Sequence, residues 1–373
     1  MVRRWLWLLV LVGVVLVVIS RFTNLQHLGD ALGRAHWWWL LLATALHAGF
    51  FLLHGNLYRL GFEAVGVSST VGGLLPVFFA STYLNAVAPS GGTAGAAVFV
   101  ADAQKRGESP ARAAVGTVVV LIADLATLLP FLAGGLLFLA KRGRLAYYDL
   151  LGASLYLVFV SGLVLALTLA RHRVGALAAM LGRIERLVAR AAGWFRRPSP
   201  LGPAWAERVA RDLSAAALAV FGSTGTVVKL LLAGTALHLV NLLGLYALFP
   251  AFEQPLNLGV GLAGFALGIV FYVIAIVPQG LAAVEGIMGL VFTSLSMPAA
   301  PALGIILAFR GMNFWLPLII GLFFVRRLPE MRGPRHTGRT ATAGPSARGA
   351  GSEATATARQ DGPGARSGEV SGD

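Results

Sequence analysis

Long apolar stretches follow one another along most of this 373-residue chain, and short polar or basic loops separate them. A helix needs about 20 apolar residues to cross a hydrocarbon layer of about 30 Å, and several stretches reach that length. The predicted spans are residues 5–19, 37–58, 113–140, 147–170, 226–249 and 302–325. The pattern therefore predicts an all-α polytopic membrane protein with about six full spans.

The first apolar stretch also has the length of a signal peptide. No small-x-small cleavage site follows it, because Ile19 and Ser20 lead directly into Arg21. We therefore expect an uncleaved first span, with Trp5 and Trp7 anchoring its end at the interface.

A break in the apolar pattern occurs twice. Each copy has Pro-x-Gly, a short apolar piece, a second proline, and a long apolar helix that carries one charge and a third proline. The first copy contains Pro89, Gly91, Pro110, Asp124 and Pro130, and the second contains Pro278, Gly280, Pro298, Arg310 and Pro317. The later prolines follow the break by 21 and 41 residues in the first copy and by 20 and 39 in the second. Paired interrupted segments are typical of transporters whose substrate site lies at the bilayer midplane.

The apolar piece after each break is short. The first ends near Ala103 after about eleven residues, too few to cross a bilayer. We therefore expect two re-entrant helical hairpins, each entering and leaving the membrane on one side. Two full crossings in place of each hairpin would leave the loop topology unchanged, so that alternative stays open.

Basic residues indicate the orientation of the chain. Between Lys229 and Arg310 there is no Lys or Arg, so the positive-inside rule places those loops outside. The loops expected inside, with both termini cytoplasmic, are those at Arg59, 105–112, 171–211 and beyond Arg326. The hairpins then enter from opposite sides, which makes the repeats inverted. The basic loop at 141–144 runs against this assignment.

The breaks have two interpretations. Proline and glycine stop a helix, and the helices that restart near Thr93 and Leu281 would direct free N–H groups and positive dipole ends towards the midplane. Two such ends beside a cavity suit the phosphate of a lipid headgroup. Alternatively, the breaks are packing kinks that neighbouring helices fill.

Ionisable residues inside apolar segments are costly and mark candidate functional sites, and three of them stand out. They are Asp124, Glu285 and Arg310. Arg310 either contacts a lipid phosphate with both arms of its guanidinium group or pairs permanently with one of the two carboxylates. Asn85 and Asn313 either hydrogen-bond a headgroup or satisfy broken backbone.

Composition narrows the class of protein. With 57% hydrophobic and 12% charged residues, the chain lacks the polar surface of a soluble domain. The net charge of +14 is explained by loops between spans, and we expect no nucleic-acid partner. The absence of cysteine excludes disulfides and thiolate chemistry, and the seven histidines form no metal-ligand cluster in sequence. We expect no metal or cofactor.

Two further segments differ from the spans. Residues 171–197 have apolar positions at helical spacing and a second face with Arg183, Arg186, Arg190 and Arg197. This basic amphipathic helix either is a loop helix that sets the membrane topology or binds anionic lipid headgroups specifically. From residue 328 to 373 the chain is rich in Gly, Ala, Thr, Ser, Pro and Arg, so we expect a disordered basic tail after a membrane domain over 1–327.

Four motifs resemble the flippase-like membrane domain family, which includes the membrane part of lysylphosphatidylglycerol synthases. They are NAVAPSGGTAG at 85–95, SPARA at 109–113 followed by Asp124, PQGLAAVEG at 278–286 and RGMNFWLP at 310–317. The resemblance covers roughly residues 1–328 and implies a helical bundle with re-entrant segments that moves lipid between leaflets. The site residues it implies are Asn85, Pro89, Gly91, Gly92, Asp124, Pro278, Gly280, Glu285, Gly286, Arg310 and Pro317. Family members often carry an arginine shortly before the acidic residue of the first long span, whereas here Leu121, Ile122 and Ala123 precede Asp124.

The function expected from these observations is translocation of a phospholipid or polyprenyl-phosphate-linked lipid across the plasma membrane, without enzymatic activity. The alternative is a non-transporting scaffold that holds a lipid-modifying enzyme or glycosyltransferase through the basic helix. An integral membrane lipid enzyme is not expected, because the sequence shows no clustered acidic or histidine ligands at a span end.

Overall fold

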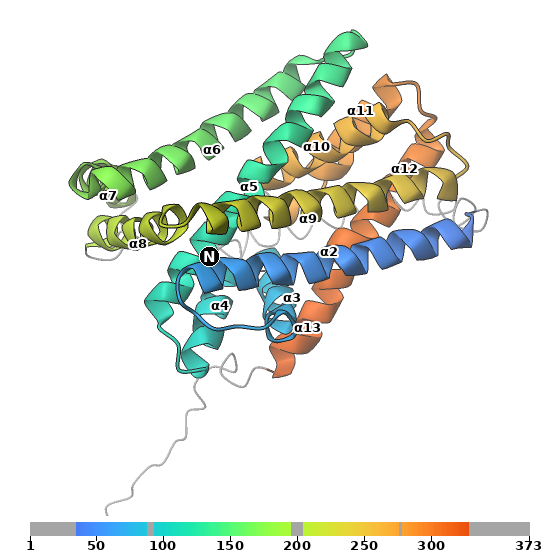
Figure 1. Cartoon of the computed structure of the whole chain (residues 1–373). Helices are drawn as coiled ribbons and strands as arrows, with labels where there is room; N and C mark the ends of the chain where they lie inside the picture. Colours follow the sequence, from blue (N-terminus) through green and yellow to red (C-terminus); the bar gives the residue numbers. More distant parts are fainter. Residues whose placement is uncertain (1–34, 88–92, 195–203, 276–277, 328–373) are drawn as a thin grey trace, which may run out of the picture. The chain divides into compact units, whose positions relative to one another are not determined.

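The computed structural model describes residues 35–87, 93–194, 204–275 and 278–327. Throughout these residues the regular structure is helical, with no β-strand (Figure 1). The predictions that lie outside the described residues concern the first span at 5–19, Pro89, Gly91 and Gly92 of the first break, Arg197, and the tail at 328–373.

Five helical segments are long and apolar enough to cross a membrane. They are α2 (Trp37–Ala64), α5 (Pro110–Lys141), α6 (Tyr147–His172), α9 (Thr224–Ala251), and the run of α12 (Ala299–Arg310), η2 (Gly311–Trp315) and α13 (Leu316–Arg327). Each coincides with a predicted span, which confirms a multi-pass helical membrane protein. Helix α2 continues past the predicted end at residue 58, where Arg59 and Glu63 form an ion pair of 2.8 Å across one helical turn.

Four shorter helices form two packed pairs. The first pair is α3 (Val71–Val87) and α4 (Thr93–Lys105), and the second is α10 (Leu258–Ile274) and α11 (Ala283–Ser294), with a 3-10 turn η1 (Pro278–Gly280) between the latter two. Gly264 and Gly268 let α10 approach α11 closely, because a Cβ atom at Gly268 would meet Met288 of α11 at 3.1 Å.

The helices of the two halves pack on each other in a reciprocal way. Helix α3 lies against α13, α10 lies against α5, and α2 lies against α9 (Figure 1). Glycines permit the close contacts: a Cβ atom at Gly135 of α5 would lie 3.1 Å from the Ala263 backbone of α10. Gly321 of α13 contacts the Phe79 carbonyl of α3 in the same manner. The first helix of each short pair therefore rests on the long helix that follows the other pair.

The region between these halves contains α6, α7 (Val174–Trp194) and α8 (Trp205–Phe221). The sequence predicts one amphipathic helix over 171–197, but α6 continues to His172 and α7 is paired with a second amphipathic helix, α8, that the sequence analysis missed. Leu177 of α7 is buried with Ala210 and Leu213 of α8. The signal for α8 was its apolar spacing of four residues among charged neighbours.

The largest apolar core joins α5, α9, α10, α11 and α12. Among its fully buried side chains are Phe249, Phe265 and Phe292. Tyr156 is also buried, and its hydroxyl donates to the Leu125 carbonyl at 2.7 Å, which attaches α6 to the middle of α5. This core holds the long helices in place around the polar residues described next.

Candidate functional site at the helix breaks

Charged and polar side chains occupy the middle of three long helices. Asp124 on α5, His238 on α9 and Arg310 in the run 299–326 each lie within three residues of the helix centre, which is about 5 Å along the axis. Ionisable groups at the centre of a span are costly unless they are paired, so their partners decide what they do.

The second break has a special backbone. Gln279, Gly280 and Ala282 have positive φ angles of 57°, 62° and 65°, a region that costs a non-glycine residue about 1–2 kcal/mol. Gly280 has no room for a side chain, because a Cβ atom would lie 2.9 Å from the Tyr272 backbone. The prediction that a helix stops here is confirmed, and α11 restarts at Ala283.

The Gln279 side chain holds the second break against α3. Its Oε1 accepts a hydrogen bond from the Tyr272 hydroxyl at 2.7 Å, and its Nε2 donates to the Thr82 carbonyl at 3.3 Å. Thr82 lies near the C-terminal end of α3, just before the first break. The two interrupted segments, which are almost 200 residues apart in sequence, thus meet through one amide side chain. The role of Gln279 was not predicted from the sequence, although a polar residue between Pro278 and Gly280 in an apolar segment indicates a hydrogen-bonding role.

Arg310 is enclosed by the second break. Its Nε donates to Glu285 Oε1 at 2.8 Å, its Nη2 donates to the Gln279 carbonyl at 3.1 Å, and its guanidinium group lies 4.7 Å from the centre of the Phe314 ring. Arg310 is 4% exposed. Of the two carboxylates that the sequence offers, Arg310 pairs with Glu285 and not with Asp124. Glu285 keeps one buried oxygen, Oε2, without a hydrogen-bond partner.

Asn313, three residues after Arg310, contacts His47 of α2. Asn313 lies in the π-helical turn η2, directly after Arg310, and its Nδ2 is 2.7 Å from His47 Nε2. His47 Nδ1 is 2.7 Å from the Ala43 carbonyl, so the network assigns the ring proton to Nδ1 and the acceptor role to Nε2. Asn313 therefore contacts another helix, α2, rather than facing open space.

On the α3–α4 side, Asn85 caps the restarting helix. Asn85 Oδ1 accepts a hydrogen bond from the Gly95 amide at 2.8 Å, within the first turn of α4. Gly95 has no side chain because Asn85 and Ser81 occupy the space next to it. Asn85 therefore has one of its two predicted roles in this structure, since it pairs with a backbone N–H group that the helix start leaves free.

Asp124 belongs to a separate polar group. His238 Nε2 donates to the Asp124 carbonyl at 2.9 Å and lies 3.3 Å from the Asp124 carboxylate. The His54 ring of α2 is close enough to both residues to interact with them electrostatically. Asp124 is thus paired with a histidine from the other half of the chain.

The remaining predicted residues differ in their surroundings. A Cβ atom at Gly286 would meet nothing within 4 Å, so this glycine borders open space in α11. Pro278 begins the η1 turn. On α7, Arg183, Arg186 and Arg190 are exposed, and Arg183 and Arg186 line a pocket of about 650 Å³ between α7 and the start of α8.

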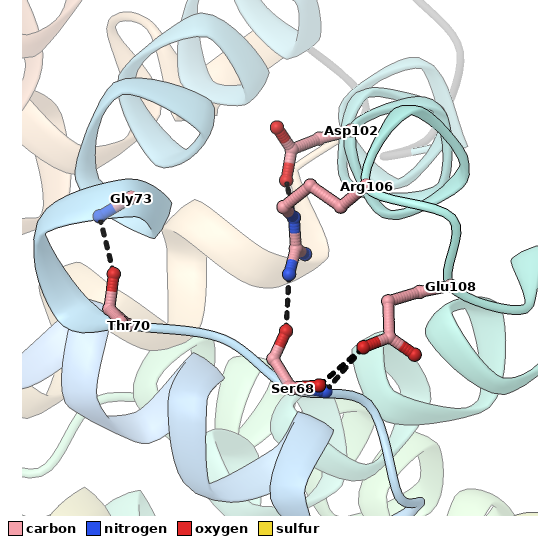
Figure 2. Close-up of polar contacts among 6 residues, drawn as sticks. All are labelled: Ser68, Thr70, Gly73, Asp102, Arg106 and Glu108. Carbon is pink, nitrogen blue, oxygen red and sulfur yellow. Dashed lines mark hydrogen bonds and ion pairs between the residues drawn. The ribbon is translucent and has the colours of Figure 1, made fainter.

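A polar clip joins the loops at the base of the α3–α4 pair (Figure 2). Glu108 accepts two hydrogen bonds from Ser68, one from its hydroxyl and one from its amide at 3.0 Å. Arg106 donates to the Ser68 carbonyl and pairs with Asp102 at 3.0 Å. The hydrogen bonds from Ser68 hold the pKa of the Glu108 carboxyl below its usual value. The clip ties the α2–α3 loop to the α4–α5 loop.

Among the described residues, no group of three His, Cys, Asp or Glu side chains is placed to hold a metal ion. The fold and the polar groups at its breaks define a multi-pass helical membrane protein with interrupted segments. The family model for the lysylphosphatidylglycerol synthase TM region matches residues 5–321, and the chain belongs to that family. A comparison with curated proteins found no match.

Proposed function

We propose that this protein moves a phospholipid or a polyprenyl-phosphate-linked lipid between the leaflets of the plasma membrane. The observation that carries the proposal is the arrangement of Arg310. This residue lies in the middle of a long helical run and bonds both to the Gln279 carbonyl of the second break and to Glu285. A buried cation beside an interrupted helix is the chemistry that an anionic headgroup needs at mid-membrane depth.

Two features support a transporter built from inverted repeats. Helices α2–α5 and α9–α13 pack on each other reciprocally, as two related copies would. Helices α4 and α11 have 13 and 12 residues, which is about 20 Å at most and less than the hydrocarbon thickness of about 30 Å. Both are therefore suited to re-entrant hairpins, which the positive-inside pattern directs from opposite sides with cytoplasmic termini.

The proposed mechanism is an exchange of anions at Arg310. In the conformation described, the Glu285 carboxylate forms an ion pair with the Arg310 guanidinium group. A lipid phosphate that enters beside the break takes the place of Glu285, so that the buried cation is never without a partner. The phosphate accepts hydrogen bonds from both arms of Arg310 while the acyl chains stay in lipid. The mechanism includes no covalent step.

The test is lipid translocation in proteoliposomes, with fluorescent phosphatidylglycerol and a zwitterionic lipid as the control substrate. Arg310→Lys keeps the charge but loses the planar fork, so we expect slower movement of the anionic lipid, and we expect Arg310→Ala to abolish it. Gly162→Ala is the matched control variant, because Gly162 is exposed on α6 with nothing within 4 Å. Unchanged translocation by a folded Arg310→Ala variant would refute the mechanism.

A scaffold function is the second candidate, and one observation favours it. Helix α7 exposes Ile184 and Leu187, at 42% and 61%, next to Arg183, Arg186 and Arg190. A face of this kind suits a membrane surface or a partner enzyme. Stoichiometric co-purification of an enzyme, lost on Leu187→Asp and retained on Arg310→Lys, is the result expected for a scaffold.

A further inference from the structure

A groove between α2 and α9 carries cations that the breaks do not use. It has a volume of about 540 Å³ and is lined by Asn56, Arg59 and Glu63 on α2 and by Lys229, Leu232 and Ala233 on α9. Figure 1 shows these two helices side by side, and the groove lies where α2 approaches its end and α9 has just begun.

The two cations in the groove lie at the same depth. Arg59 is five residues before the end of α2, and Lys229 is five residues after the start of α9, so each lies about 7 Å inside the helix end. Both residues line the same groove, and for helices of this length we expect that depth to be the level of the lipid headgroups and glycerol backbones. The arrangement therefore presents two positive charges to one leaflet.

The protein satisfies these charges unequally. Arg59 donates to Asn56 Oδ1 at 3.1 Å and pairs with Glu63 at 2.8 Å, which orients the guanidinium group along the groove. Lys229 is exposed and forms no ion pair or hydrogen bond with the described residues. The groove therefore has one positive charge that is available to pair with a ligand.

Exposed apolar side chains lie at the groove and one helical turn before it on α9. Leu232 is 66% exposed and Val228 is 47% exposed on α9. A ligand that satisfies both parts of this surface has an anionic phosphate next to an acyl chain. A free phosphate ester would satisfy the lysine but leave the leucine and valine uncovered.

We propose that the groove of Asn56, Arg59 and Lys229 binds the phosphate of an anionic phospholipid, at a site separate from Arg310. If the groove is a site that lipid occupies before it reaches the breaks, that role rests on the proposed translocation. The preference of the groove for anionic lipid does not rest on it. Glu63 limits the affinity, because its carboxylate competes with the phosphate for Arg59.

The absence of native cysteine allows a direct test. Leu232→Cys carries a fluorophore at the groove, and Leu243→Cys carries it 11 residues further along α9, on the same face about three turns away. Leu243 is 41% exposed, so both labels reach lipid. Quenching of the fluorophore by nitroxide-labelled phosphatidylglycerol is compared with quenching by nitroxide-labelled phosphatidylcholine in nanodiscs. At each position the ratio of the two quenching efficiencies is taken, because both lipids reach the fluorophore at the same depth.

We expect phosphatidylglycerol to be preferred about fivefold at position 232, the effect of one basic residue near an anionic surface, and not to be preferred at position 243. Arg59→Gln with Lys229→Gln should remove the preference, and Glu63→Gln should increase it. An equal ratio at both positions, or a preference that survives the double substitution, would overturn the proposal. Loss of the preference on addition of millimolar glycerol phosphate would overturn the assignment to a lipid. Binding is measured without translocation, so a protein that binds phosphatidylglycerol here but moves none refutes only the proposed function.

Discussion

At the α3–α4 break, the described contacts involve neutral groups, with the Asn85 amide oxygen on the Gly95 amide. At the α10–α11 break, the Arg310–Glu285 ion pair holds a backbone in which Gln279, Gly280 and Ala282 all have positive φ. Two helix pairs at equivalent places in the packing are thus stabilised by different chemistry. Under the proposed function, an anionic ligand competes for the second break through Arg310, whereas the described contact at the first break is made by two neutral amide groups.

The largest expected effect comes from removing the cation. Arg310→Met leaves the Glu285 carboxylate buried without its partner, and we expect a loss of about 3–5 kcal/mol in the free energy of unfolding. The measurement is SDS-induced unfolding in mixed micelles. Arg310→Met combined with Glu285→Met should recover most of the loss, because no charge is then left buried. A double variant as unstable as the single one would show that the ion pair is not what stabilises this break.

The second prediction concerns the backbone of the same break. Gly280→Ala puts a methyl group 2.9 Å from the Tyr272 backbone at a positive φ, so we expect a loss of about 1–3 kcal/mol. Gly286→Ala, in the same hairpin but facing open space, should be neutral or stabilising by about 1 kcal/mol, since alanine favours a helix over glycine. The same unfolding assay compares the two, and equal losses would contradict the strain at Gly280.

For the first break we expect a smaller effect. Asn85→Ala removes the acceptor of the Gly95 amide, a capping interaction that contributes about 1 kcal/mol. Asn85→Asp keeps an acceptor oxygen at the same place and should lose less. Amide hydrogen exchange across residues 93–97 reports the fraying of α4 directly. Unchanged exchange in Asn85→Ala would mean that the cap contributes nothing.

The smallest effect is expected from acidification of the clip at the base of the α3–α4 pair. The pKa of Glu108 is lowered from its ordinary value of 4.5 by hydrogen bonds from Ser68, which the carboxylate accepts more strongly than the protonated carboxyl group does. The clip is therefore at full strength above pH 4.5 and weakens as the pH falls through the lowered pKa. We expect the Ser68 amide to lose protection from hydrogen exchange over that range, and Glu108→Gln to remove the dependence on pH. The α10–α11 pair serves as the internal comparison.

Part of the candidate site was predictable from local sequence. The stop at Pro278–Gly280 follows from residues that cannot continue a helix, and the motifs around Glu285 and Arg310 point to the family that the chain belongs to. The partners were not predictable. From the sequence, either Asp124 or Glu285 was a possible partner for Arg310. The choice of Glu285 depends on which faces of α11 and α12 meet.

The sequence by itself determined the five spans found among the described residues, because insertion into lipid depends on the length and apolarity of each segment, which are local properties. Only the tertiary structure decided that Gln279 reaches Thr82, that Asn313 reaches His47 and that α8 pairs with α7. The first two contacts join residues far apart in the chain, and inside lipid such contacts are selected by close packing and the pairing of polar groups rather than by hydrophobicity. A hydrophobic pattern shows that a helix is in the membrane, but not which of its faces touches a neighbour.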